Sequence, residues 1–338
     1  MRRSLFIVLS CALMVALMGG MALAKDIRFG HVAPTFHGQH LGTVAFANYV
    51  KEKTNGEINI QTFPMGQLGG EMSMAEQVQT GTLEMASITT AVMMNFVPQA
   101  GMIDLPFVFP TRETAYAVLA DKAFQDKFFG LFPAKGFQVI GYTENEFRDL
   151  TNSKRTVRKP EDVKGLKLRV MKSPVYMDTW QQLGASTVGL PFPEIYGALQ
   201  QGVIDGQENP LFTSILIKVP EVNKFATRTQ HSITECLIIV NPDFWASLTP
   251  EQQKIFQEAA DICIKVNREE NVKAMQKLPK LDMSVDEYLK KENVEVVDLT
   301  PEERAAFAEA MRPVWDKYRE TGPEMYDFFM SKIKEHTK

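Results

Sequence analysis

The sequence predicts an α/β protein of about two domains. Its 338 residues are 45% hydrophobic and 23% charged, which is an ordinary globular composition with enough length for two hydrophobic cores. Segments in which apolar residues alternate, as in strands, are interleaved with segments of helical periodicity. No Gly/Ser-rich linker interrupts the chain. We therefore expect two domains joined by structured crossovers, an arrangement that favours a hinge over a flexible tether.

The first 24 residues have the pattern of a secretory signal. Arg2 and Arg3 are followed by an apolar run from Leu5 to Met18 and then by Ala22-Leu23-Ala24. The run is short for a membrane span. We predict cleavage after residue 24 and a periplasmic location; an uncleaved anchor is the alternative.

Charge and cysteine content narrow the class of the mature chain. The full sequence carries 37 Lys and Arg against 41 Asp and Glu, so it lacks the basic excess of a nucleic-acid-binding protein and we expect no nucleic-acid partner. After cleavage only Cys236 and Cys263 remain. One disulfide is possible, but Cys236 lies in the apolar run 236–240, where a buried thiol is favoured. Whether the two cysteines pair is left open by the sequence.

Strand and helix patterns alternate along the chain. The early part predicts β-α-β units, which build a parallel sheet with helices on its faces. Expected strands cover 26–30, 57–63, 83–89, 138–142, 165–170 and 232–240, and expected helices cover 38–53, 72–80, 111–129, 175–183 and 193–201. Two late helices begin at the capping boxes 249–252 and 300–303, and Pro313 is expected to interrupt the second of them.

Motifs for catalysis are missing from the sequence. It contains no G-x-S-x-G, Walker loop, H-E-x-x-H or C-x-x-C, so we predict no catalytic residues and no cofactor. His31, His37 and His40 lie within ten residues, which raises an exported metal-dependent hydrolase as an alternative. Their spacing matches no standard ligand pattern, and no metal site is predicted.

Two arginines are candidates for anion binding. Arg169 alternates with Leu168 and Val170 in an expected strand. In a central strand Arg169 would be a partly buried cation that needs an anionic partner, whereas in an edge strand it would be solvated. Arg148 allows either an anion-binding role or a surface salt bridge. Asn209 precedes Pro210, which holds its amide on extended backbone at the end of a polar turn.

Several segments in order resemble the solute receptors of TRAP transporters, the periplasmic C4-dicarboxylate-binding-protein family. They are Gly165–Val170, Leu183–Ala185, Phe192–Tyr196 and Ala198–Pro210, with Phe63-Pro64, Gly66–Gly69, Leu105–Phe107, Glu221-Val222 and His231 in support. The resemblance implies a two-lobed periplasmic binding protein fold, in which each lobe is a sheet flanked by helices, with a ligand cleft between the lobes and a long bridging helix. It implies one lobe from 25–146 plus about 232–274, and a second from 147–231 plus about 275–338.

The resemblance also implies a function. The chain is expected to be a monomeric extracytoplasmic receptor that binds a small organic acid and delivers it to the membrane permease of a TRAP transporter, without doing chemistry. An ABC-type receptor is the alternative within binding proteins. The ligand could be a C4-dicarboxylate, a sugar acid, or an aromatic or keto acid.

Site roles follow from the same resemblance. Arg169 would clamp the ligand carboxylate, Arg148 would assist it or bind a second acidic group, and Asn209 would hold a carboxylate or hydroxyl oxygen. Phe192 would pack on the ligand body. The loops after the early strands, with His37, Gln39 and Glu71, would discriminate among ligands. Two departures, His31 after the first strand and the proline-free loop 186–190, weaken an assignment to sialic acid.

Overall fold

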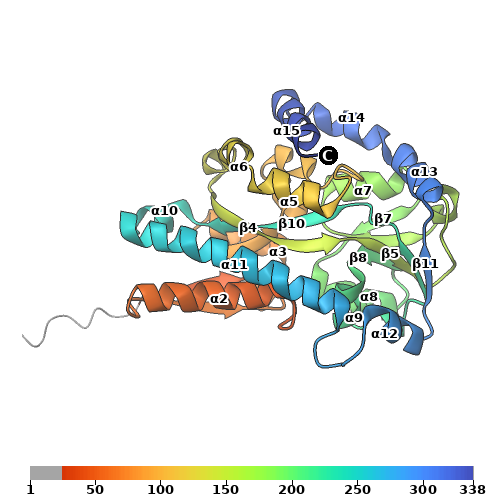
Figure 1. Cartoon of the computed structure of the whole chain (residues 1–338), viewed down its shortest axis with the longest axis horizontal. Helices are drawn as coiled ribbons and strands as arrows, with labels where there is room; N and C mark the ends of the chain where they lie inside the picture. Colours follow the sequence, from red (N-terminus) through yellow and green to blue (C-terminus); the bar gives the residue numbers. More distant parts are fainter. Residues whose placement is uncertain (1–24, 338) are drawn as a thin grey trace, which may run out of the picture.

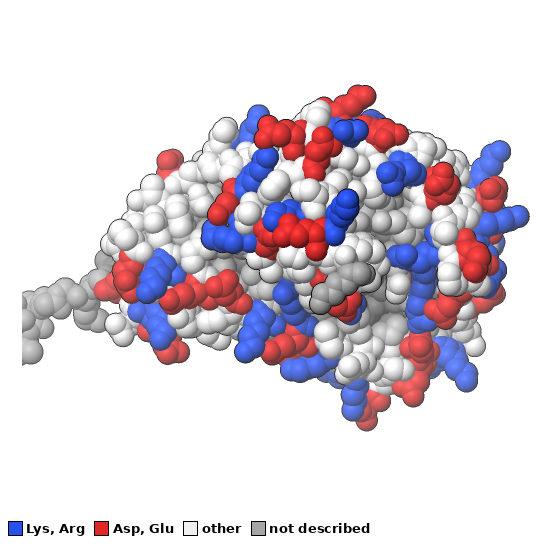
Figure 2. All heavy atoms as spheres, turned by 45° about the horizontal axis from the view of Figure 1, so that its top comes forward, with Lys and Arg blue, Asp and Glu red and all other residues white. Residues whose placement is uncertain are grey.

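The computed structural model describes residues 25–337, so the predicted signal segment lies outside the described residues. Two mixed sheets lie end to end, with helices packed around them (Figure 1). Among the described helices, none is long and apolar enough to cross a membrane. On the face shown in Figure 2, basic and acidic side chains are interspersed rather than gathered by sign.

The first sheet has five strands in the order β2-β1-β3-β10-β4. Their bounds are β1 (Lys25–Gly30), β2 (Ile58–Phe63), β3 (Met85–Thr89), β4 (Gln138–Phe147) and β10 (Ile233–Val240). β1 pairs in parallel with β2 and β3, as the β-α-β pattern predicts, whereas β10 is antiparallel to both β3 and β4. The chain thus returns to this sheet from the second one by inserting β10 between two earlier strands.

The second sheet has six strands in the order β11-β9-β5-β8-β6-β7. Their bounds are β5 (Asp149–Asn152), β6 (Lys167–Val170), β7 (Ser186–Gly189), β8 (Gly206–Asn209), β9 (Phe225–Arg228) and β11 (Glu295–Asp298). β6 pairs in parallel with β7 on one side and β8 on the other, so it is an interior strand. This placement decides between the two alternatives for Arg169, because a side chain on an interior strand is not solvated along a free edge.

Helices cover both sheets and link them. Their bounds are α2 (Gly38–Lys53), α3 (Glu71–Gln79), α4 (Thr90–Met93), α5 (Arg112–Ala120), α6 (Lys122–Phe129), α7 (Pro174–Gln181), α8 (Ile195–Gln200), α9 (Leu211–Leu216), α10 (Pro242–Ala246), α11 (Pro250–Gln276), α12 (Val285–Lys291), α13 (Pro301–Met311), α14 (Pro313–Arg319) and α15 (Pro323–His336). Short 3-10 turns lie at Pro98–Met102 (η1), Pro133–Lys135 (η2), Pro160–Val163 (η3), Phe192–Glu194 (η4) and Val219–Glu221 (η5).

Two expectations about helices are decided by the structure. The single helix predicted over 111–129 is wrong, because it breaks at Asp121, whose backbone is extended and whose carboxylate accepts from the N–H of Phe124 to cap α6. The interruption expected at Pro313 is confirmed, since α13 ends at Met311 and α14 starts at the proline. Proline fits the first position of a helix, where its missing N–H has no intrahelical partner.

Helix α11 is the long bridging helix. It begins at a capping box on Thr249 and runs for 27 residues. Its first half packs against α2 and contributes Phe256 and Cys263 to the core of the first lobe. Its end contributes Ala274 to a cluster with Leu211 of the second lobe. Cys263 and Cys236 are both buried and unpaired, so they form no disulfide in this structure.

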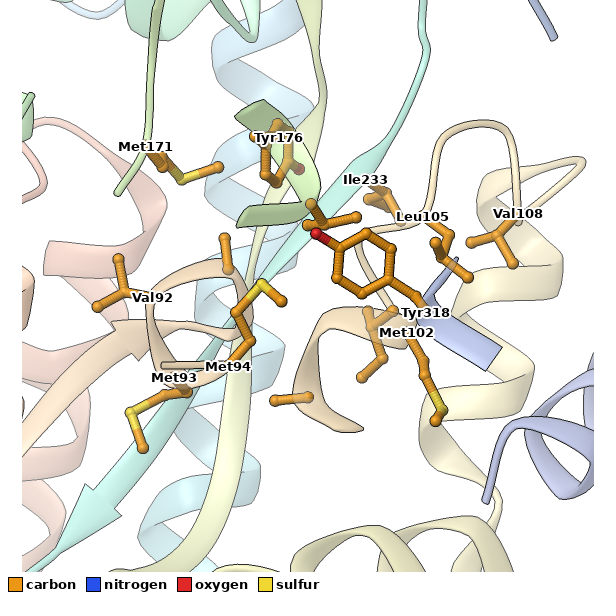
Figure 3. Close-up of a cluster of buried hydrophobic side chains, with 14 of the residues drawn as sticks. Val92, Met93, Met94, Met102, Leu105, Val108, Met171, Tyr176, Ile233 and Tyr318 are labelled. Carbon is orange, nitrogen blue, oxygen red and sulfur yellow. The ribbon is translucent and has the colours of Figure 1, made fainter. Parts of the chain in front are cut away.

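The largest hydrophobic cluster joins the two lobes. Met93 and Met94 come from the first lobe, Met171 and Tyr176 from the second, and Tyr318 from the C-terminal helices (Figure 3). The C-terminal helices cover this junction: α14 contacts both α7 and η1, and α15 packs on α5, α6 and η1. The final helix therefore lies against elements of the first lobe, whereas the resemblance implies that the segment from about 275 belongs to the second.

Close packing of α2 against α11 depends on glycine. A Cβ atom added to Gly42 would lie 2.7 Å from the carbonyl oxygen of Cys263, whereas a Cβ added to Gly197 of α8 would meet no atom within 4 Å. We expect Gly42→Ala to lower the free energy of unfolding by about 1–3 kcal/mol, because the helices must move apart. Gly197→Ala should raise it by about 0.5–1 kcal/mol through helix propensity. Urea unfolding of both variants tests this; a Gly42→Ala protein as stable as the wild type would contradict it.

Candidate ligand-binding site

A narrow cavity lies where the two lobes meet. Its volume is about 20 Å³, room for little more than one water molecule. It is lined by Val32, Ala33, Pro34, His37, Gln39, Glu71, Thr89, Asn145, Arg148, Arg169, Met171, Phe192, Asn209, Thr213 and Cys236. All seven site residues proposed from the sequence are among these, although they come from segments far apart in the chain.

Arg169 presents an unpartnered nitrogen at this cavity. Its Nε and Nη2 donate to the carbonyl oxygen of Leu190 at 2.9 and 2.7 Å, while the buried Nη1 has no hydrogen-bond partner. The residue is only 2% exposed, and burial lowers its pKa to about 10. Even so, the guanidinium stays charged at neutral pH. A buried cation with an unused donor is a binding group for an anion.

Arg148, by contrast, is already paired. It follows β4 and has no exposed surface. Its Nε and Nη2 donate to the two carboxylate oxygens of Glu208 at 2.5 and 3.0 Å, and Nη2 also donates to Asn209 Oδ1 at 2.9 Å. Burial opposes the charge on Arg148, but Glu208 outweighs it and the pKa is raised. The surface salt bridge considered for Arg148 is therefore wrong: the bridge is present, but it is fully buried.

The amide of Asn209 also has internal partners. Besides accepting from Arg148, it donates through Nδ2 to Gln207 Oε1. His231 completes the group, with Nε2 3.2 Å from Glu208 Oε2. Asn209 and Arg148 thus line the cavity as parts of a charge-balanced network. Neither offers an unpartnered donor of the kind that Arg169 has in Nη1.

The first lobe supplies the opposite wall. His37 caps α2 by accepting from the N–H of Gln39 through Nδ1 at 3.1 Å, and it stacks on Phe212. Burial lowers the pKa of His37 to about 4, so the ring is neutral and its buried Nε2 lacks a partner. Gln39 donates to Ser87 Oγ at 2.8 Å. Helix capping therefore fixes the position of one more unused polar atom at the cavity.

Glu71 and Phe192 stand where the cavity opens. The carboxylate of Glu71 accepts from the backbone N–H and the hydroxyl of Thr89 at 2.8 and 3.2 Å. Burial raises its pKa. Phe192, at the start of the η4 turn, is partly buried and lines the cavity from the second lobe. A carboxylate so close to Arg169 disfavours a further negative charge beside it.

Sequence reasoning missed Thr213 and Asn145. Thr213 lies in the first turn of α9, and its buried Oγ1 has no partner. The turn at Asn209 and Pro210 leads directly into α9, so residues just after the turn could have been considered. Asn145 belongs to the same strand end as Arg148. Arg169 Nη1, His37 Nε2 and Thr213 Oγ1 together give the cavity three buried polar atoms without partners.

The three early histidines are not grouped with metal-ligand spacing in the described residues. His31 Nε2 lies 3.1 Å from His40 Nδ1, which makes a hydrogen-bonded pair, and His37 serves as a helix cap. Within residues 25–337 the one group with metal-ligand spacing is Asp121, Glu335 and His336. There Lys332 Nζ already contacts both carboxylates, at 2.8 and 3.0 Å.

Two lobes, a bridging helix and a buried anion-accepting group between them define a two-lobed solute receptor. The sequence model of the family described as bacterial extracellular solute-binding protein, family 7, matches residues 29–321 of this chain. The chain belongs to this family, and it is a periplasmic-binding-protein-type solute receptor of a TRAP transporter. The ABC-type alternative is thereby set aside.

Known relatives cover nearly the whole chain. The 2,3-diketo-L-gulonate-binding periplasmic protein of Escherichia coli K12 is 31% identical over 289 residues, 85% of each chain. A TRAP periplasmic solute binding protein from Desulfovibrio salexigens, with bound orotic acid, has a TM-score of 0.86 at 31% identity and covers 92% of this chain and 99% of that one. The sugar acid binding protein of Advenella mimigardefordensis, in complex with galactonate, has a TM-score of 0.84 at 29% identity, covering 93% and 99%.

Because Arg148 is paired with Glu208, we predict that removing Arg148 lowers the free energy of unfolding. Arg148→Ala leaves the Glu208 carboxylate buried without its main partner, which should cost about 3–5 kcal/mol of unfolding free energy. Arg158→Ala removes a partly exposed pair with Glu303 and should cost less than about 1 kcal/mol. Chemical unfolding measures both. Equal stability of the two variants would contradict the assigned role. Adding Glu208→Gln to Arg148→Ala should restore part of the lost stability, and a double variant no more stable than Arg148→Ala would also contradict it.

Asp104 makes stability depend on pH. Its Oδ1 lies 3.4 Å from the hydroxyl of Tyr176, its Oδ2 has no partner, and the residue is 1% exposed. Burial raises its pKa from 3.8 to about 8. The folded state therefore holds a proton that the unfolded chain releases, and this contribution to stability is lost as pH rises from about 4 to 8.

Asp104→Asn should flatten the pH dependence of stability. A single group contributes at most about 1.4 kcal/mol per pH unit in this window. Urea unfolding at several values between pH 5 and 8 should give a shallower slope for the variant than for the wild type. Parallel slopes would show that Asp104 ionises normally.

Proposed function

We propose that this receptor captures an organic monocarboxylate, with the carboxylate bound to Arg169. The observation that carries the proposal is the unpartnered Nη1 of Arg169 on a guanidinium whose other nitrogens are held by Leu190. A carboxylate would satisfy this donor, and a charge-assisted hydrogen bond is about twice as strong as a neutral one. Fixing one edge of the guanidinium on a carbonyl orients the other edge before the ligand arrives.

Charge balance favours one carboxylate over two. Arg148 is neutralised by Glu208, which leaves Arg169 as the one cation lining the described cavity without an ion-pair partner. Glu71 places an acid at the same cavity. A C4-dicarboxylate would set a second negative charge near Glu71 without a matching cation. The orotic acid and galactonate bound by the two similar structures also carry one carboxylate each.

The other unpartnered atoms at the cavity suggest which group of the ligand lies next to its carboxylate. Thr213 Oγ1 can donate or accept, and neutral His37 has a ring nitrogen available. A hydroxyl or keto oxygen on the neighbouring carbon would use them. We therefore favour a 2-hydroxy or 2-oxo acid.

Capture requires the lobes to separate and close. A volume of about 20 Å³ holds no organic acid, so the ligand must enter an opened cleft. The acid then stabilises the closed arrangement by the extra contacts that it makes there. We further propose that the chain is exported and cleaved after Ala24, acts as a monomer, performs no chemistry, and delivers the acid to the permease subunits in the membrane.

Thermal denaturation of the exported protein against a panel of acids tests the ligand class. The protein is first unfolded and refolded to strip any carried ligand. An acid at 100 times its Kd should add about 2.7 kcal/mol of stability, a shift of several degrees. Monocarboxylates with a 2-hydroxy or 2-oxo group should move the midpoint and succinate should not. A shift with succinate alone would contradict the charge argument.

Removing Arg169 should abolish most binding. Arg169→Ala is expected to cost about 2–5 kcal/mol of binding free energy, measured by calorimetry with the best acid of the panel. Thermal stability without ligand should change little, because Arg169 has no ion-pair partner among residues 25–337. Arg319→Ala, which removes a surface pair with Asp327, is the matched control and should bind normally. Unchanged affinity of Arg169→Ala would overturn the clamp.

A further inference from the structure

A second and larger cavity continues from the first one past Arg169. Its volume is about 320 Å³. It is lined by Gly70, Glu71, Met72, Ser73, Glu76, Val92, Arg169, Met171, Lys172, Leu190, Pro191 and Phe192. Four of these, Glu71, Arg169, Met171 and Phe192, also line the narrow cavity. Arg169 thus stands at the junction of a small space and a large one.

Contacts between the lobes frame this larger cavity. On one side Gly66 and Gly70 approach Pro193 and Pro191 so closely that an added Cβ would come within 3.0 and 3.3 Å of them. On the other side Asn95 Nδ2 donates to the carbonyl oxygen of Lys172 at 2.8 Å. The lobes therefore touch around the cavity and leave it open between them. We call this space the portal.

The walls of the portal change character along its length. Val92 and Met171 are buried, and Met72, Leu190 and Pro191 are partly buried, so apart from Glu71 the part next to Arg169 is mainly apolar. Ser73, Glu76 and Lys172 are exposed and form a polar rim. An apolar passage with a charged end at Arg169 suits a molecule whose carboxylate is followed by a hydrocarbon body.

We propose that the portal is a subsite for the tail of the ligand. The acid would be a 2-hydroxy or 2-oxo monocarboxylate with an apolar substituent of about four carbons or a ring. Its head binds at Arg169, and its tail lies between Met72 and Val92 of the first lobe and Leu190 and Pro191 of the second. This inference rests on the proposed function, since it takes the carboxylate at Arg169 as its starting point. Size supports this direction, because the space on the side of the tail is about 320 Å³ and the narrow cavity only about 20 Å³.

A matched series of acids tests the proposal by calorimetry. Lactate and 2-hydroxyhexanoate share a head and differ by three methylenes. Each buried methylene is worth about a fourfold gain in affinity, so 2-hydroxyhexanoate should bind roughly 60-fold more tightly than lactate. Gluconate has the same six carbons but a hydroxylated tail, and it should bind more weakly than 2-hydroxyhexanoate. Phenyllactate should bind at least as tightly as 2-hydroxyhexanoate.

A variant that fills the portal distinguishes binding of the ligand's tail from binding of its carboxylate head. Ser73→Trp places a large ring at the rim and should weaken phenyllactate binding by at least about tenfold while leaving lactate within about twofold. Ser153→Trp, at an exposed serine in the second lobe away from the portal lining, is the matched control and should change neither. Thermal midpoints of both variants without ligand verify that they fold.

The outcomes separate this inference from the proposed function. Equal affinity for lactate and phenyllactate, tighter binding of gluconate than of 2-hydroxyhexanoate, or an unaffected Ser73→Trp protein would overturn the portal subsite. If acid binding were still lost in the Arg169→Ala protein, the proposed receptor function would stand without the portal subsite. If no acid bound to the refolded wild-type protein, both would fall.

Discussion

The buried ion pair between Arg148 and Glu208 is the interaction on which the rest of the site depends. Arg148 lies on the crossover from β4 to β5, and Glu208 lies in β8, an interior strand of the second sheet. The pair is completely buried, so its desolvation cost is large and only close, multiple hydrogen bonds can offset it. Asn209 and His231 provide those bonds. The network thus holds the crossover and the turn after β8 together.

Pairing one arginine defines the role of the other. Because Glu208 pairs with Arg148, Arg169 is the one arginine lining the described cavity that has no ion-pair partner. Burying that cation without a partner is unfavourable, and a ligand anion removes the penalty. The same free energy that binds the acid therefore also favours the closed lobes, which couples capture to conformation. In the binding mode that we propose, Glu71 would restrict this coupling to ligands of low negative charge.

Several features could be predicted from residues alone because their causes are local. The capping boxes at Thr249 and Thr300 locate two helix starts, and Pro313 separates α13 from α14. The break at Asp121 escaped prediction because apolar residues continue on both sides of it, although its cause is also local: the Asp121 carboxylate accepts from the N–H of Phe124, three residues further on. Thr213 escaped because a threonine in an apolar helix has no local mark of a binding role.

The sequence by itself determined the α/β class through its periodicity and several helix starts through their caps, because these signals lie in neighbouring residues. Its ordered motifs, through the family resemblance, implied the bridging helix and seven of the residues that line the cleft. Only the tertiary structure decided which arginine is free. Arg148 and Arg169 look equally available along the chain, but Glu208 is 60 residues from Arg148 and meets it only when β5 and β8 pair. Long-range pairing sets burial and charge balance, and those two quantities decide what the cleft can bind.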